Sequence, residues 1–117
     1  MSPEDFDEYV RSIGYKVELQ QGTDGNVYTV VLGLRIPNGT LAGRVCDVGV
    51  LRPTGTPYVM PAAIHTRPAL VPMDMQGPIK TQASPLGSDW QYWSRRLDRV
   101  PTPQVIWTHI LTVLTSV

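Results

Sequence analysis

Prolines crowd the middle of this chain and restrict what it can fold into. The sequence has 11 prolines in 117 residues, and they thin out at both ends and gather between Pro53 and Pro103. Each proline removes a backbone N–H donor, so regular helix or strand is interrupted wherever prolines recur. We therefore expect long, shaped, irregular segments in the middle of the chain, and functional residues often lie on such segments.

Length and charge narrow the class of protein. A chain of 117 residues supports a single modest core, so we expect residues 1–117 to form one domain. Ten Lys and Arg balance ten Asp and Glu, which argues against a nucleic-acid binder or a protein of anionic membrane surfaces. No apolar run approaches the roughly 20 residues of a membrane span, and the acidic start is unlike a signal peptide. These features predict a soluble, cytoplasmic protein.

The first half of the chain predicts one helix and four strands. Ser2 is a suitable N-cap for a helix over residues 3–13, which Gly14 would end. Alternating and β-branched residues predict strands at residues 15–19, 27–36, 41–51 and 58–66. Short turns join these strands, so an antiparallel four-stranded meander is the natural pairing.

The second half of the chain is less regular. Residues 67–89 show no sustained period, and we expect a long loop there. Residues 90–97 are expected to form one or two helical turns. A closing helix is expected after Thr102 as N-cap, with apolar residues at helical spacing from Ile106 to Leu114. The order helix, meander, long Pro-rich loop and helix predicts an α+β fold with helices packed on one sheet.

The sequence favours neither a metal site nor a bound cofactor. His65 and His109 are the only histidines and lie far apart in sequence, whereas zinc sites usually show paired ligands at close spacing. The glycines form no phosphate-binding or dinucleotide-binding loop. The single cysteine, Cys46, lies in an alternating strand segment, which favours a buried residue over a reactive thiol.

The densest unusual run is WQYWSRR at residues 90–96. In a helix, Trp90 and Trp93 would lie on one side, where their usual role is to fill a core, although they are also candidate binding residues. Arg95 and Arg96 could stack, pair with acids or bind a carboxylate. Ser94 is a candidate nucleophile if a base reaches it.

Three segments resemble a known family. Residues 55–70, GTPYVMPAAIHTRPAL, resemble a proline-rich stretch that leads into an apolar strand. Residues 90–95, WQYWSR, are similar to a Trp-Gln-x-aromatic-Ser-Arg run, and residues 108–111, THIL, resemble the start of a last helix. On these segments the chain resembles the prokaryotic ubiquitin-conjugating-enzyme-like family E. The resemblance covers residues 27–114 and implies a helix, a four-stranded meander, a Pro-rich loop and a C-terminal helix.

The resemblance implies a place in a bacterial ubiquitin-like modification pathway. The partners would be a ubiquitin-like protein and an adenylating activating enzyme, and antiphage defence is the implied setting. The chain departs from the pattern, because no cysteine follows Cys46 and a thioester at the usual site is excluded. In ordinary ubiquitin-conjugating enzymes, the active cysteine lies about eight residues before a Trp-Ser pair. Counting back from Trp93-Ser94 reaches Pro85, which is next to Ser84. His65 lacks the asparagine of the usual His-Pro-Asn motif, and Arg96 stands where a histidine is usual.

Two mechanisms remain open within this class. Ser84 or Ser94 could accept the ubiquitin-like C-terminus as an oxyester, which requires a base such as His65. Alternatively, the protein is a non-catalytic scaffold that binds the ubiquitin-like protein through its sheet or loop. Outside this class, a small protein-binding module is the main alternative. A hydrolase has less support, because no Ser-His-Asp arrangement can be picked out. Whether His65 reaches Ser84 depends on the geometry of the loop.

Overall fold

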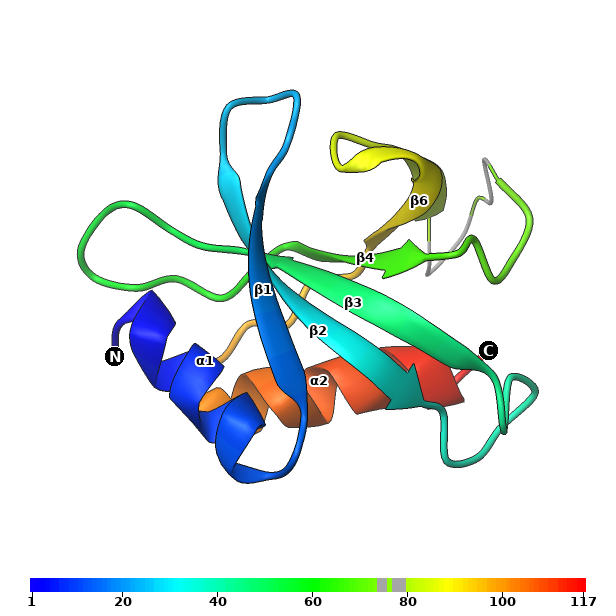
Figure 1. Cartoon of the computed structure of the whole chain (residues 1–117), viewed down its shortest axis with the longest axis horizontal. Coiled ribbons are helices and arrows are strands. Elements are labelled where there is room, and N and C mark those ends of the chain that lie inside the picture. The colour runs from blue at the N-terminus through cyan, green and yellow to red at the C-terminus, as the bar shows by residue number, and fades with distance from the viewer. Residues whose placement is uncertain (74–75, 77–79) are drawn as a thin grey trace.

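The computed structural model describes residues 1–73, 76 and 80–117. In that part of the chain, two helices enclose six strands in sequence: α1 (Pro3–Ser12), β1 (Lys16–Gln21), β2 (Val27–Arg35), β3 (Val45–Leu51), β4 (Ala63–Arg67), β5 (Lys80–Ser84), β6 (Gly87–Ser94) and α2 (Pro103–Thr115). The strands form one antiparallel sheet in the order β1-β2-β3-β4-β6-β5 (Figure 1). The predicted α+β class is confirmed. Neither described helix is long and apolar enough to cross a bilayer.

The predicted N-caps mark the starts of both helices. The Ser2 backbone N–H donates to Asp5 Oδ2 at 2.7 Å in the first turn of α1. The Val105 backbone N–H donates to Thr102 Oγ1 at 3.1 Å in the first turn of α2. These bonds satisfy backbone donors that have no partner within the helix. The starts of both helices were therefore predicted correctly from their capping residues.

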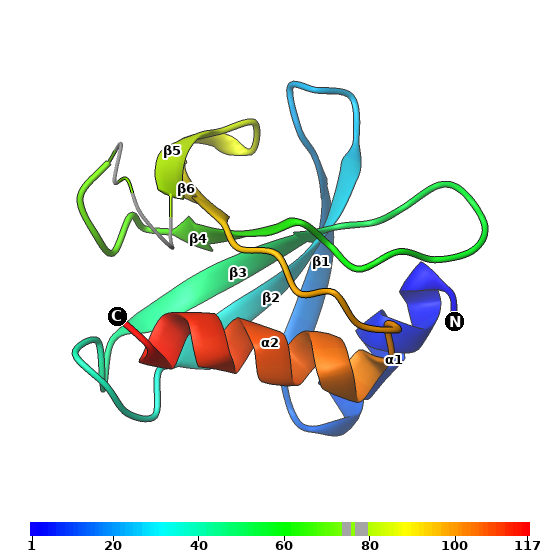
Figure 2. The ribbon, with the colours of Figure 1, turned by 180° about the vertical axis from the view of Figure 1, so that it is seen from behind.

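The larger core lies between the sheet and the two helices. Figure 2 shows α2 lying across the strands with α1 beside its first turns. The buried side chains come from both helices and from alternate positions of the central strands, and they include Phe6, Val10, Val31, Leu34, Val48, Ile64, Trp93, Ile106, Ile110 and Leu114. Burial of this apolar surface is the main stabilising term for a domain of this size. We call this the inner core.

Strand β6 corrects the prediction for the aromatic run. Residues 90–97 were expected to be helical, but Gly87–Ser94 is a strand that pairs with both β4 and β5. Residues three apart in a strand point to opposite faces of the sheet. Trp93 therefore lies in the inner core, whereas Trp90 packs on the other face. Aromatic residues suit strands as well as helices, and pairing with β4 and β5 decides between the two.

Two further predictions need correction. The predicted loop over residues 67–89 contains β5 and the start of β6, while residues 74–75 and 77–79 of it lie outside the described residues. The sequence of β5, KTQAS, buries only Thr81, so it carries no apolar alternation to reveal a strand. The predicted strands 41–51 and 58–66 begin later, at Val45 and Ala63. The described sheet therefore has six strands, and the expected four-stranded sheet is wrong in its extent.

A second apolar cluster covers the opposite face of the sheet. Tyr28 and Val30 of β2 pack there against Leu86 and Trp90 of the β5–β6 hairpin. Gly49 of β3 allows this close approach, since a Cβ at that position would lie 2.7 Å from Leu86 Cδ1. We call these residues the outer cluster. It holds the β5–β6 hairpin against the sheet and so positions Ser84, the last residue of β5.

Backbone and side-chain hydrogen bonds also join the two hairpins at their tips. The Thr23 backbone N–H donates to the Pro85 carbonyl at 2.8 Å, and Gln20 Nε2 donates to the Leu86 carbonyl at 2.9 Å. Figure 1 shows the β1–β2 tip and the β5–β6 tip on the same side of the sheet. The two outer hairpins of the sheet therefore contact each other through their turns.

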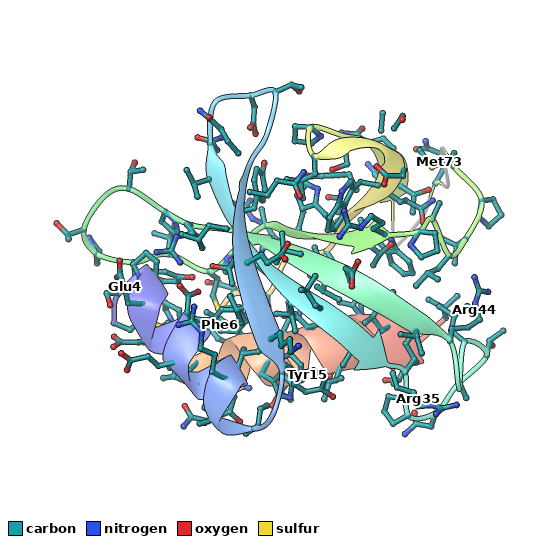
Figure 3. The ribbon with its side chains drawn as sticks, in the orientation of Figure 1. Glu4, Phe6, Tyr15, Arg35, Arg44 and Met73 are labelled. Carbon is teal, nitrogen blue, oxygen red and sulfur yellow. The ribbon has the colours of Figure 1, made fainter. Side chains whose placement is uncertain are left out.

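A fully buried amide holds the segment that follows β4. Gln91 has no exposed surface, and its Oε1 accepts from the backbone N–H of Leu70 at 3.1 Å. Its Nε2 donates to the Val71 carbonyl at 2.8 Å and contacts Met73 Sδ at 3.0 Å. Met73 is labelled in Figure 3 and marks the segment that follows β4. One side chain thereby satisfies backbone groups that strand pairing does not reach.

We predict that Gln91→Met destabilises the fold by about 2 kcal/mol, because it leaves buried backbone groups without partners. The matched control is Gln82→Met on β5, where the side chain is exposed. Urea unfolding of both variants measures the difference. Equal free energies of unfolding for the two variants would contradict the role assigned to Gln91.

Candidate functional site

Two of the predicted catalytic residues meet on the outer face of the sheet. His65 Nδ1 lies 2.8 Å from Ser84 Oγ, within hydrogen-bond distance. His65 is in the middle of β4, where it pairs with Gly49 of β3 and Tyr92 of β6. Ser84 ends β5, where the register with β6 shifts and Ser84 pairs with Gly87. The shift in the ladder brings a residue of the sheet edge next to β4.

Aromatic rings fix the orientation of the imidazole. The ring centroids of Tyr28 and Tyr92 lie 5.0 Å and 5.2 Å from that of His65, and both pairs are edge-to-face. Only 3% of His65 is exposed, whereas Ser84 is half-buried. The Leu86 backbone N–H donates to Ser84 Oγ at 3.1 Å. The serine oxygen is therefore held between a ring nitrogen and a backbone donor.

Burial sets the protonation state of His65. It lowers the pKa of the imidazole from 6.5 to about 4, against a smaller opposing effect from the charge of Asp24. The ring is therefore neutral at pH 7. With its proton on Nε2, Nδ1 can accept the hydroxyl proton of Ser84. A base of such low pKa is available at neutral pH but has little driving force to take that proton.

Tyr28 links the histidine to a carboxylate at the surface. The Tyr28 hydroxyl donates to Asp24 Oδ2 at 2.7 Å, and this hydrogen bond lowers the pKa of Asp24. Burial, followed by the same bond to Asp24, raises the pKa of the Tyr28 hydroxyl. Asp24 thus acts on the tyrosine, and no carboxylate of the described residues bonds to His65. The described pair lacks the acid of a Ser-His-Asp hydrolase.

The other candidate nucleophiles lie elsewhere. Ser94, at the end of β6, pairs with Ala63 and Lys80, two positions along β4 from His65. Cys46 lies in the inner core with 3% exposed, which confirms the predicted buried position. Burial raises the pKa of its thiol to about 11, so the thiol is protonated at pH 7. Of the two predicted serines, Ser84 is therefore the one that contacts the predicted base.

The predicted binding tryptophans are buried in the two apolar clusters. Trp93 is fully buried and its Nε1 donates to Thr66 Oγ1 at 3.0 Å. Trp90 has 2% exposed, and the Arg67 guanidinium stacks on its ring at 4.7 Å from the centroid. Arg67 is in turn paired with Asp47 at 2.9 Å. In this structure both indoles serve as packing groups.

The two arginines predicted as binding residues, Arg95 and Arg96, do not contact the Ser84–His65 pair. The Arg95 backbone binds its neighbours, since its N–H donates to the Ala62 carbonyl at 3.2 Å and its carbonyl lies 3.1 Å from His109 Nε2. The Arg96 side chain is exposed and lines a cleft away from Ser84. The structure therefore brings His65 and Ser84 together but places the arginines elsewhere.

Tyr28 and Tyr92 were missed at the level of sequence. Tyr28 lies on a correctly predicted strand, and alternation along β2 was the available signal for its face. Tyr92 lies in the run expected to be helical, so its place beside β4 was not foreseeable from that expectation. No group of three metal-binding side chains was found among residues 1–73, 76 and 80–117.

Comparisons with protein-family models, with curated proteins and with solved structures find no match for this chain. The resemblance to a family therefore rests on its residue runs. Two of these runs are neighbours in the sheet, because β4 belongs to residues 55–70 and pairs with β6, which contains most of residues 90–95.

We predict that burial of His65 makes stability fall as the pH is lowered. The unfolded chain takes up a proton on this residue below about pH 6.5, and the folded protein only near pH 4. Between pH 6.5 and pH 4 the free energy of unfolding therefore falls by about 3 kcal/mol. Urea unfolding at several pH values should show a shallower pH dependence for His65→Gln than for the natural sequence.

Ring nitrogen chemical shifts of His65 provide a direct check. They should report a neutral ring with its proton on Nε2 at pH 7. A titration midpoint near 6.5 would instead show that the imidazole is solvated and would contradict the buried site.

Proposed function

We propose that this protein is a ubiquitin-conjugating-enzyme-like component of a bacterial ubiquitin-like modification pathway. It accepts or binds a ubiquitin-like protein delivered by an adenylating activating enzyme, and it does so without a cysteine at the usual site. The resemblance of residues 55–70 and 90–95 supports the pathway. The single observation that supports an accepting role is the 2.8 Å contact between Ser84 Oγ and His65 Nδ1.

The chemistry that this contact supports is transfer of an acyl group to Ser84. Ser84 Oγ attacks the carbonyl carbon of the thioester that links the ubiquitin-like C-terminus to the activating enzyme, while His65 Nδ1 takes the hydroxyl proton. The C–S bond then breaks, the sulfur leaves as a thiol with the proton from His65, and an oxyester remains on Ser84. No oxidant or reductant is needed for this step.

Two features of the site make this transfer slow. The low pKa of His65 weakens it as a base, and no carboxylate of the described residues stabilises the imidazolium. The half-buried position of Ser84 also limits approach of a large acyl donor. These features suit a single acceptance event better than rapid turnover.

The same features favour a second candidate, a non-catalytic protein-binding module. In this version the bond between His65 and Ser84 stabilises the outer face, and the ubiquitin-like protein binds without a covalent link. The observation that favours it is the 3% exposure of His65. The two candidates differ in one measurable property, the existence of a covalent adduct.

We predict a covalent adduct on Ser84 when the protein is incubated with ATP, the activating enzyme and the ubiquitin-like protein of its pathway. Intact-mass spectrometry should show an adduct that resists reducing agent and is cleaved by mild hydroxide. Ser84→Ala should abolish it, and His65→Gln should slow its formation by about a hundredfold. Ser84→Cys should convert it to an adduct that thiol reducing agents release, because a thioester replaces the oxyester.

Matched controls separate this site from the other candidates. Ser94→Ala and Cys46→Ser should leave the adduct unchanged, because neither residue contacts His65. With partners shown to be active, complex formation without an adduct would contradict the acceptor role and support the binding module. Absence of both complex and adduct would remove the proposed pathway altogether.

A further inference from the structure

A cleft of about 530 Å³ has neither Ser84 nor His65 among its lining residues. It is formed between the segment that precedes β4 and the segment that joins β6 to α2. Figure 2 shows these two segments running beside each other next to the start of α2. The lining residues are Tyr58, Val59, Met60, Pro61, Arg96, Leu97, Asp98, Arg99 and Pro101. The volume lies in the range of ligand sites in proteins.

The charges of this cleft are not satisfied within the described protein. Arg52 and Arg67 each pair with a carboxylate, at Asp7 and Asp47. Arg96 and Arg99 line the cleft, and neither has a hydrogen-bond or ion-pair partner among residues 1–73, 76 and 80–117. A guanidinium presents a planar fork of donors that matches a carboxylate.

The charge balance favours a singly charged group. Asp98 lines the same cleft as the two arginines, so the three side chains together carry one net positive charge. A carboxylate matches this balance, whereas the second charge of a phosphate would face repulsion from Asp98. Asp98 can in turn accept from a peptide N–H beside the carboxylate.

A second cleft extends the first along α2. Its volume is about 290 Å³, and it shares Leu97 and Arg99 with the first. Val105 and Thr108 of α2 are among the residues that line it. The first turn of α2 has no acidic residue, so the positive end of the helix dipole is not offset there. The residues that line the second cleft follow α2 from Gln104 to Thr112, so the joined clefts suit an extended chain better than a compact anion.

Exposed apolar side chains flank the same region. Val59 in the cleft is 58% exposed, and Val100, between two lining residues, is 83% exposed. Valine at such exposure contributes apolar surface that a bound chain would cover.

We propose that these joined clefts bind an extended peptide that carries an acidic side chain followed by an apolar one. The carboxylate lies between Arg96 and Arg99, and the apolar side chain packs on Leu97 and Val105 in the second cleft. This site goes beyond the function proposed for Ser84, and its test uses neither the activating enzyme nor an adduct.

The test is an NMR titration of the ¹⁵N-labelled full chain with the peptide acetyl-Gly-Asp-Leu-Gly-amide. Saturable shifts are expected at the backbone amides of Leu97, Arg99 and Thr108. The matched peptide with asparagine in place of aspartate should bind about tenfold more weakly, because it lacks the charge-assisted hydrogen bonds. Sodium acetate serves as the bare anion and should bind more weakly than the acidic peptide.

Variants assign the binding to the two arginines. Arg96→Gln and Arg99→Gln should each weaken binding by about tenfold. Arg35→Gln is the matched control, because Arg35 is exposed at the end of β2, at the far corner from α1 (Figure 3). Equal binding of the asparagine peptide, equal affinity for acetate, an equal effect of Arg35→Gln or the absence of saturable shifts would each overturn the proposal.

Discussion

Strand β6 carries one tryptophan to each face of the sheet, and each of the two apolar clusters in the described part of the chain contains one of them. Trp93 is fully buried in the inner core beneath the helices, and Trp90 is buried in the outer cluster. Because side chains alternate along a strand, a spacing of three forces the two rings apart. The same strand also buries Gln91, whose amide binds the backbone after β4. The packing of the helices, the outer cluster and the segment after β4 thus all depend on the register of β6 in the sheet.

The candidate site depends on the outer cluster in particular. Gly49 leaves space for Leu86 and Trp90 on the outer face, and this contact keeps the β5–β6 hairpin over the sheet. The hairpin in turn brings Ser84 to His65. Burial then has opposing effects, since it orients the imidazole between aromatic rings but lowers its basicity. The arrangement gives a well-ordered but weakly basic pair.

The sequence predicted those features that local signals determine. Ser2 and Thr102 are capping residues, and both helices begin where expected. Residues 90–97 were misassigned because a three-residue spacing of tryptophans fits one helix face and two strand faces equally well, and only pairing with β4 decides. His65 and Ser84 were named as candidates. Their contact depends on a register shift at the end of β5, which no local sequence pattern predicts.

The contact between the two hairpin tips also bears on the order of folding. Gln20 and Leu86 are 66 residues apart in sequence, so this contact closes a long loop, whereas each hairpin forms from neighbouring residues. Closing a long loop costs more chain entropy than closing a short one. We therefore expect the hairpins to form before they meet, and the contact between His65 and Ser84 to be among the last to form. A nascent chain cannot complete this site until β6 has been synthesised.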